Sequence, residues 1–288
     1  MKRQDFRFAH RLRVRWVEVD MQQIVFNGHY LMYFDTAVTD YWRCLAMPYA
    51  ATMQQLGGDL YVKKASVEYH ASAEMDDFLD ICMRCDRIGN SSMTFAGAIF
   101  RGDELLITGE LVYVYADPVA KKSQAIPPAL RDMLEAFERG EDMAQLHLGN
   151  WHDLQALAAP LRNEVFVDEQ KVPADMEWDE DDPTALHAVL VNRMGVPLAT
   201  GRLLQASPGV AGVARIGRMA VKKQMRGTHL GRRVLDALMQ AARSRGDARV
   251  LLHAQCSAQG FYARAGFVPH GPVFEEAGIA HIEMVRDL

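Results

Sequence analysis

Four strand-like segments follow one another between residues 60 and 116, and no helical segment interrupts them. The short turn sequences GNSS and RGDE separate the last three segments, and strands joined by such turns pair antiparallel. A helix-like segment, 29–46, precedes them, so helix and sheet are segregated along the chain. This order predicts an α+β unit in which one helix packs on a curved sheet. The strands are predicted at 60–70, 78–88, 93–101 and 104–116.

Strands and helices alternate from about residue 141 onward, which predicts an α/β layer structure. Pro160 is expected to end or kink the first helix, Gly246 to cap the end of a later one, and Ser257 to cap a short one. A chain of 288 residues suits two domains, which we place at 1–140 and 141–288. The strands are predicted at 143–148, 186–193, 198–205, 214–221 and 249–255, and the helices at 151–170, 232–246 and 257–267.

The charge is close to balanced in both halves. Residues 1–140 carry 16 basic and 19 acidic side chains and residues 141–288 carry 16 and 18, so the net charges of −3 and −2 sum to −5. Neither half is basic, which argues against nucleic acid or an anionic membrane as a partner. The first residues lack the apolar core of a signal peptide, and no apolar run is long enough to cross a membrane. We therefore expect a cytoplasmic protein.

The four cysteines are too few for a disulfide scaffold of this length. Cys82 and Cys85 match C-x-x-C, but they lie in the alternating segment LDICMRCDR. Residues three apart on a strand point to opposite faces, so this pair cannot share a metal or a disulfide there. No His, Cys or carboxylate spacing elsewhere indicates a metal site.

Asp20 lies at the end of a strand expected at 11–19, and a helix is expected to begin about ten residues further on. The first turn of a helix exposes N–H groups that can hold an oxyanion. If the loop between them folds back, Asp20 faces that helix start across a gap wide enough for a carbonyl. Asp20 could then attack an acyl group or activate water. Asn27 or His29 could cap the helix or orient a substrate, and His29 could equally be an ordinary half-buried histidine.

Four segments follow one another in the first half: WVEVDMQQIVFNGHYLMYFDTA, VEYHASAEMDDFLDI, NSSMTF and IPPALR. In this order they resemble the 4-hydroxybenzoyl-CoA thioesterase type of hot-dog protein over about residues 8–137. The resemblance implies a long helix wrapped by an antiparallel sheet, a dimer as the minimum unit and acyl-CoA substrates. It places the catalytic carboxylate on Asp20. The family's usual Gly three residues later is Gln23, and its frequent His is Asn27. The implied substrate-binding residues are Asn27, Gly28, His29 and Tyr30.

The sequence QMRGTHLGRRV, residues 224–234, follows a predicted strand and opens a predicted helix. Backbone N–H groups at such a helix start bind phosphate, and glycines let the backbone approach it closely. Arg226 adds a positive charge. The motif taken alone is also compatible with an ordinary loop before a helix.

The motif has six characteristic neighbours: RMAV, LLHAQ and FYARAGF, and the upstream LRNEVFVDEQ, EWDEDD and LHAVLV. Together these segments resemble the GNAT acyltransferase superfamily over about residues 143–288. The resemblance implies transfer of an acetyl group from acetyl-CoA to an amine, with coenzyme A as a cosubstrate that is not permanently bound. Tyr262 takes the position of the residue that protonates the departing thiolate. The fourth loop position, usually Gly, is His229. The implied cofactor-binding residues are Met219, Ala220 and Val221 for pantetheine, and Arg226, Gly227, Thr228, His229, Leu230 and Gly231 for pyrophosphate.

Other conspicuous residues receive structural interpretations. The acidic segment 177–182 is expected to be a solvated loop, with attraction of a cationic amine as the alternative. His187 and His253 lie within predicted strands and are expected to be packed, as are Trp151 and Trp178. Candidates for the general base of the second half are Glu169 and Glu177.

Together these features predict a bifunctional acyl-CoA enzyme. The first half would hydrolyse an acyl thioester, and the second would transfer an acyl group from coenzyme A to a small amine. Two alternatives remain open: the second half could be a CoA-binding sensor, or the first half could be a dimerisation scaffold. A homo-oligomer, dimer or dimer of dimers, is expected through the first half, because its sheet should continue across a two-fold axis.

Overall fold

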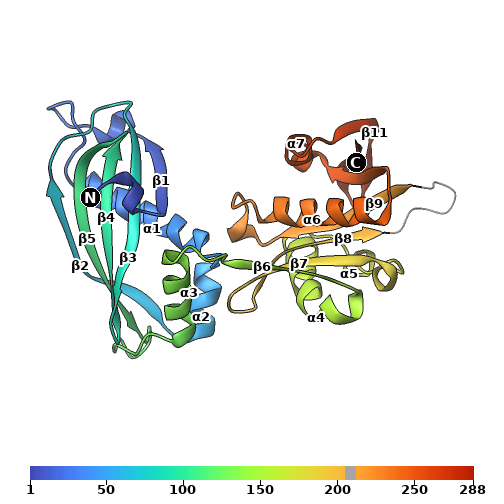
Figure 1. The fold of residues 1–288 in the computed structure, drawn as a ribbon, viewed down its shortest axis with the longest axis horizontal. Coiled ribbons are helices and arrows are strands. Elements are labelled where there is room, and N and C mark those ends of the chain that lie inside the picture. The colour runs from blue at the N-terminus through green and yellow to red at the C-terminus, as the bar shows by residue number, and fades with distance from the viewer. Residues whose placement is uncertain (205–211) are drawn as a thin grey trace. The chain divides into compact units, whose positions relative to one another are not determined.

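The computed structural model describes residues 1–204 and 212–288. The chain forms two compact units, Met1–Met143 and Ala144–Leu288. The first unit has a hot-dog fold, with one long helix against an antiparallel sheet, and the second has an α/β GNAT fold (Figure 1). In the described residues, no helix is both long and apolar enough to cross a membrane.

The five strands of the first unit pair in the order β1-β3-β4-β5-β2, all antiparallel. The expected strand at 11–19 is wrong in its second part. Val14 leaves the ladder to bond with the turn at Asp76 and Asp77, and Trp16–Glu18 form a 3₁₀ turn. The elements are β1 (Phe8–Arg13), α1 (His29–Cys44), α2 (Tyr49–Leu56), β2 (Asp59–Tyr69), β3 (Phe78–Ile88), β4 (Ser92–Arg101), β5 (Glu104–Ala116) and α3 (Pro128–Glu138).

Helix α1 lies close to the sheet because two facing glycines make room for it. Gly97 of β4 and Gly109 of β5 are directly opposite each other, and the ring of Phe34 lies over both. A Cβ added at Gly97 would be 2.5 Å from Phe34 Cε1, and one at Gly109 would be 2.7 Å from Cε2. Phe34 is completely buried. The missing side chains therefore allow the sheet to wrap tightly around the helix.

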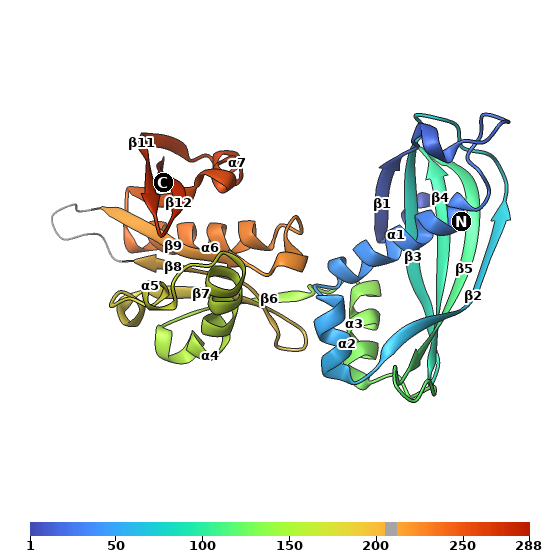
Figure 2. The same cartoon turned by 180° about the vertical axis from the view of Figure 1, so that it is seen from behind.

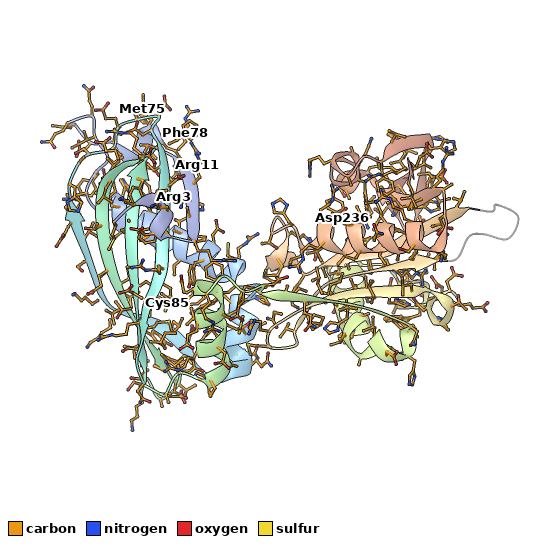
Figure 3. The ribbon with its side chains drawn as sticks, viewed as in Figure 1. Arg3, Arg11, Met75, Phe78, Cys85 and Asp236 are labelled. Carbon is orange, nitrogen blue, oxygen red and sulfur yellow. The ribbon has the colours of Figure 1, made fainter. Side chains whose placement is uncertain are left out.

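The C-x-x-C cysteines do not form a pair. Cys82 is buried in a small apolar cluster with Phe6, Ala98 and Phe100, while the backbone N–H of Cys85 donates to Glu138 of α3. Both thiols are free. Figure 3 labels Cys85 on β3, together with Arg11 and Phe78, whose guanidinium and ring lie 5.4 Å apart where β1 meets β3.

The seven strands of the second unit pair in the order β11-β12-β10-β9-β8-β7-β6, and only β9 and β10 are parallel. Helices α4 and α6 cover opposite faces of this sheet, as Figures 1 and 2 show from the two sides. Strands β11 and β12 were not predicted from the sequence. The elements are β6 (Ala144–Gly149), α4 (Trp151–Arg162), α5 (Ala174–Glu177), β7 (Leu186–Asn192), β8 (Pro197–Leu204), β9 (Val213–Val221), α6 (Leu230–Arg245), β10 (Arg249–Gln255), α7 (Gln259–Arg264), β11 (Val268–Glu276) and β12 (Ile279–Asp287).

Of the expectations about helix ends, that for Ser257 is wrong and that for Gly246 is confirmed, while Pro160 does not end its helix. Helix α4 continues through Pro160 and widens into a π-helix, Asn163–Glu169, in which Gln170 N donates to the carbonyl five residues back. Ser257 caps no helix and lies inside a 3₁₀ turn, Cys256–Ala258. Gly246 ends α6 with φ of 92°, as expected of a helix C-cap. Gln205, the last residue of a predicted strand, lies outside the described residues.

Candidate active site

A cavity of about 980 Å³ opens in the second unit where β9 and β10 separate. The two strands pair only from Val213 to Arg215 of β9, so the edge of residues 216–221 that faces β10 has no strand partner. Such an edge can hydrogen-bond an extended ligand as another strand would. The predicted site residues that line the cavity are Met219, Ala220, Val221, Arg226, Gly227, His229, Leu230, Gly231 and Tyr262.

A β-bulge lies beside this open edge. Thr200 of β8 pairs with Ala220, and Arg202 pairs with Gly217, so Arg218 and Met219 share the place opposite one residue. Arg218 has φ of +49°. A bulge bends a strand and strengthens its twist, which turns residues 218–221 away from β10 and opens the cavity.

The loop from Lys222 to α6 contains the residues predicted to form a phosphate cradle. Gly227 has φ of +85° and His229, the N-cap of α6, has φ of +64°. His229 therefore occupies a conformation that suits glycine, and its Cβ carries the strain. A Cβ on Gly231 would be 3.0 Å from Val221 Cγ2, so this glycine brings the helix start against the strand. Thr228 is not among the lining residues, and its hydroxyl donates to Met225 O within the loop.

The charge of Arg226 is paired. Its guanidinium makes a bidentate contact with Glu169, with N–O distances of 2.6 and 2.7 Å. Hydrogen bonds from Arg226 lower the pKa of Glu169 below its ordinary value. A carboxylate held in this way is a weaker base, so Glu169 suits the positioning of Arg226 better than proton abstraction.

Tyr262 of α7 reaches the cavity from among aromatic rings. Its ring packs edge-on against Phe261 and Phe267. Burial raises the pKa of its hydroxyl well above the ordinary value, so the phenol keeps its proton at neutral and mildly alkaline pH. Among the described residues we find no hydrogen-bond partner for this hydroxyl, and it is free to donate to a ligand.

The expectation of a solvated loop at 177–182 is wrong for two of its acids, whereas Glu180 and Asp181 are exposed as expected. Glu177 and Asp182 are 2% and 3% exposed, and both bond to Arg162, which is 1% exposed. Burial opposes the charge of Asp182, but hydrogen bonds and charge from Arg162 and Arg202 outweigh it and lower its pKa. Burial instead raises the pKa of Glu177. Glu177 is therefore part of an internal ion cluster and does not line the cavity.

Two tryptophans complete this ion cluster. The guanidinium of Arg162 lies 5.2 Å from the ring centre of Trp151 and 4.8 Å from that of Trp178, distances typical of cation–π contacts. His187 is buried, and its Nε2 lies 2.9 Å from Asp182 O. His187 is packed, as expected, whereas Trp178 contacts Arg162 but stays 40% exposed.

His253 differs from that expectation, because it lines the cavity. Its Nδ1 lies 3.2 Å from Glu276 Oε2 and 3.2 Å from a nitrogen of Arg215. The alternation of buried and half-buried residues in RVLLHAQ places His253 and Gln255 on the less buried face of β10. The sequence signal that could have identified His253 as a site residue was the presence of two polar residues on one face of this strand.

In the first unit, the residues predicted to form a hydrolytic site do not line a common cavity in the way that the predicted residues of the second unit do. Val19 bridges to Val25, Asp20 N donates to Ile24 O, and Phe26 N donates to Glu18 O, so residues 18–26 form a small hairpin. Helix α1 starts just after the open end of this hairpin, where Glu18 and Phe26 pair. Asp20 lies two residues closer to the turn than Glu18, about 7 Å along the strand. Within the described residues, no contact joins Asp20 to residues 27–30, and its Oδ1 accepts from Gln22 N in the turn.

The helix-start residues differ in burial: Asn27 and Gly28 are exposed, His29 is half-buried and Tyr30 is buried. His29 N donates to Phe26 O, and Asn27 O accepts from the hydroxyl of Tyr69. The hydroxyl of Tyr30 accepts from Ala73 N, and its ring is buried. Gly28 is exposed and serves as the N-cap of α1.

The buried carboxylate of this region is Glu18, which the sequence analysis did not single out. It accepts from the backbone and side chain of Arg15 and from the hydroxyl of Tyr33. Burial opposes its charge, but these hydrogen bonds outweigh it and lower the pKa of Glu18. All its contacts are internal, so Glu18 anchors the hairpin to α1.

A cavity between diverging parallel strands, beside a loop that opens a helix, agrees with a GNAT fold for the second unit. Residues 156–288 match the family model described as an acetyltransferase (GNAT) domain, and the chain belongs to this family. Residues 22–108 match the thioesterase superfamily model. Within the described residues, we find no group of three or more His, Cys, Asp or Glu side chains that could hold a metal.

Individual relatives match one half of the chain at a time. The uncharacterized N-acetyltransferase YjcF of Bacillus subtilis is 34% identical over 128 residues, which are 44% of this chain and 88% of that protein. Protein ElaA of Escherichia coli is 34% identical over 130 residues, 44% and 84% of the two chains. The crystal structure of Escherichia coli YbaW, described as a probable thioesterase, has a TM-score of 0.39 and 21% identity over 44% of this chain and 96% of its own.

Proposed function

We propose that the chain is a bifunctional acyl-CoA enzyme. Residues 144–288 transfer an acyl group, most simply acetyl, from coenzyme A to an amine, and residues 1–143 hydrolyse an acyl-CoA thioester. The observation that carries this proposal is the single cavity around which the open edge of β9, the loop before α6 and Tyr262 converge. The four cysteines are free thiols, which agrees with a reducing cytoplasm as the site of action.

The transfer half binds its cosubstrate mainly through backbone groups. Residues 219–221 offer the strand edge that faces away from β8 to the pantetheine arm, where Val221 O accepts from Arg226 Nε. Residues 226–231 offer N–H groups at the start of α6 to the pyrophosphate. Arg226, held by Glu169, lies beside this cradle. Tyr262 protonates the thiolate that leaves, because burial keeps its phenol protonated.

The hydrolytic half uses Asp20, and a second copy of the chain completes its site. One chain leaves Asp20 apart from the helix start, while β2 is an edge strand with both faces largely exposed (Figure 2). Pairing of β2 with its copy would continue the sheet, and a two-fold axis would bring the surfaces of two hairpins and helix starts together. Large apolar side chains exposed here are Trp16, Val17, Met21, Phe26, Leu31, Met32, Tyr61, Val62 and Tyr69.

A second candidate for the first unit is a dimerisation scaffold without hydrolytic activity. Its support is the Oδ1 of Asp20, which is already engaged by Gln22 N. An acceptor-free assay of thiol release separates the two candidates, since a scaffold releases none.

The transfer activity is tested with Tyr262→Phe in the full-length chain. With acetyl-CoA and a panel of primary amines, we expect the variant to lose about 100-fold in kcat, a typical contribution of a general acid. Because burial raises the pKa of Tyr262, the advantage of the wild type should persist beyond about pH 10, where an ordinary tyrosine would lose its proton. Equal rates for the two proteins would contradict the role of Tyr262. Binding of acetyl-CoA without transfer to any amine would identify a sensor instead.

A further inference from the structure

The cavity has a second polar face, formed by three strands on the side of the sheet that carries α4. Strand register gives this face directly: His253 of β10 pairs with Glu283 of β12, Gln255 pairs with His281, and Phe274 of β11 pairs with His281. Paired residues point to the same face. Gln255 bonds to Gln170, at the end of the π-helix that follows α4, so this face lies on the α4 side.

The cradle lies on the other side of the sheet. A Cβ on Gly201 of β8 would meet Met219 together with Val234 and Leu238 of α6, so Met219 points towards α6. Arg202, the next residue, points to the opposite face, where it bonds to Asp182. The cavity therefore connects the phosphate cradle on the α6 side with the polar face on the α4 side.

His253 stands where the two strands separate. The last pair of the parallel ladder is Arg215 with Leu251, and His253 follows two residues later. Phe274 packs edge-on against its ring at 4.9 Å between ring centres, which restricts its orientation. A ligand lying along residues 219–221 and directed towards the junction of β9 and β10 would end near this ring.

The two ring nitrogens of His253 face different groups. Glu276 Oε2 lies 3.2 Å from Nδ1, so Nδ1–H can donate to it and leave a lone pair on Nε2. Glu283 Oε2 lies 3.9 Å from Nε2, beyond hydrogen-bond distance. An ammonium group between Nε2 and Glu283 would meet a proton acceptor and a negative charge. Arg215, at 3.2 Å from Nδ1, competes with Glu276 for that nitrogen. Two further histidines lie on this face: His281, and His270 of β11, whose Nδ1 is 2.7 Å from the other carboxylate oxygen of Glu283, Oε1.

The other candidate bases are less suitable. Glu169 is held by Arg226, Glu177 lies in the buried ion cluster, and His229 caps α6 beside the cradle. His281 stacks on Phe274 with its Nδ1 2.8 Å from Ile279 O, further along β12 from the strand junction.

We propose that His253 is the general base of the transfer reaction and that the acceptor is a protonated primary amine, which enters from the α4 side and is held by Glu283. Glu276 is a positioning residue that holds the imidazole ring. This inference deepens the proposed acyl transfer and rests on it.

The protons and bonds balance as follows. One proton of R–NH₃⁺ passes to Nε2 of His253 and then to solvent. The free amine forms a C–N bond to the acyl carbon, the C–S bond breaks, and the thiolate takes the proton of Tyr262. The nitrogen loses its second proton as the amide forms, and this proton restores the hydroxyl group of Tyr262. The products are an N-acyl amine and coenzyme A.

The test compares full-length wild type with His253→Gln, using acetyl-CoA and a panel of aliphatic, aromatic and polyamine primary amines. We expect kcat/KM at pH 7 to fall about 100-fold and the acidic limb of the pH profile to disappear, with an unchanged Kd for CoA. Because the amine deprotonates by itself at high pH, the difference should narrow there. His152→Gln, an exposed histidine on α4, is the matched control and should behave as wild type.

Two further variants test the partners of His253. Glu276→Gln should lower kcat about tenfold with little change in KM, and Glu283→Gln should chiefly raise KM. A His253→Gln variant that keeps wild-type activity and pH profile overturns the proposal, while transfer itself would still stand. Loss of CoA binding in step with activity would make His253 merely structural.

If the wild type transfers to none of the amines, the proposed transfer is contradicted. A binding measurement then tests whether the acceptor site around His253 exists. The ring Cε1–H resonance of His253, assigned by its loss in His253→Gln, should shift when spermidine or tyramine is added to the CoA-saturated protein, and that of His152 should not. Absence of a shift with either amine would overturn the acceptor site as well.

Discussion

The two halves place their candidate site residues in opposite ways. In the GNAT half, one chain brings a strand edge, a loop, a helix start and Tyr262 around one cavity, and a buried ion cluster lies beneath it. In the hot-dog half, one chain holds Asp20 in a hairpin turn away from the start of α1, and the surrounding apolar side chains are exposed. Under the function proposed above, the site of the GNAT half would be complete within one chain, whereas the hydrolytic site of the hot-dog half would need another copy.

The largest expected effect concerns the ion cluster. Arg162→Met removes the cation between Glu177 and Asp182 and leaves buried acids with less compensation, which should destabilise the GNAT half by about 3–5 kcal/mol. Hydrogen exchange of residues 186–192, followed by mass spectrometry, would measure this while leaving the hot-dog half as an internal reference. Arg249→Met breaks an exposed pair with Asp287 and should cost at most about 1 kcal/mol. Equal effects of the two changes would show that burial adds nothing here.

Asp20→Asn tests the other half. Thiol release from acyl-CoAs of different chain length, without an acceptor, should fall about 100-fold, or about 2.7 kcal/mol of transition-state stabilisation. Glu104→Gln, at an exposed hairpin end, is the control and should keep wild-type rates.

Dilution sharpens the same comparison. If the hydrolytic site needs two copies, the specific rate of thiol release should fall once light scattering shows monomers, while amine acylation should not. Hydrolysis by a monomer would contradict the two-copy site.

Gly97→Ala tests the close approach of α1 to its sheet. The added Cβ would lie 2.5 Å from Phe34, and overpacking of this kind costs about 1–3 kcal/mol. Denaturant unfolding followed by circular dichroism would measure the loss. Phe34→Leu in the same chain should reduce the penalty of the added methyl group, since it removes the clashing ring. Simple additivity of the two changes would argue against this contact as the cause.

His229→Gly should have the smallest effect. Glycine relieves a left-handed conformation that costs about 1 kcal/mol in the ligand-free protein, so the GNAT half should gain up to about that much stability while the Kd for acetyl-CoA stays nearly unchanged. His229→Ala keeps the strain and removes the imidazole, so calorimetric titration of both variants distinguishes strain from a direct contact. Weaker binding in both would indicate that the imidazole itself contacts the ligand.

Local motifs in the sequence predicted the cradle better than they predicted its surroundings. Residues 224–234 are contiguous, so turn, charge and helix start could be recognised together. The partners of His253 come from β11 and β12, two strands whose patterns were not recognised. Glu177 and Asp182 appeared solvated because their partners, Arg162 and Arg202, are distant in sequence.

The hot-dog half shows the same limit. The helix at 29–46 and the strands at 78–88 and 104–116 were predicted almost to the residue, since long periodic segments carry a clear signal. The hairpin of residues 18–26 was not, because its few backbone bonds depend on the neighbouring turn at residues 73–77. That hairpin decides where Asp20 lies.

The ion cluster around Arg162 has a consequence for the behaviour of the protein on heating. It contains three arginines, at 162, 202 and 218, and three acids, at 177, 179 and 182, so its formal charges cancel. The hydration free energy of charged groups becomes less favourable as the temperature rises, so burying these groups costs less. Such ion networks are therefore more stabilising at high temperature than at low temperature. In the hot-dog half, the buried acid Glu18 pairs with one arginine, Arg15, whose side chain is largely exposed, so the comparable ion pairing is smaller there. Warming should thus unfold the two halves at separate temperatures, the hot-dog half first.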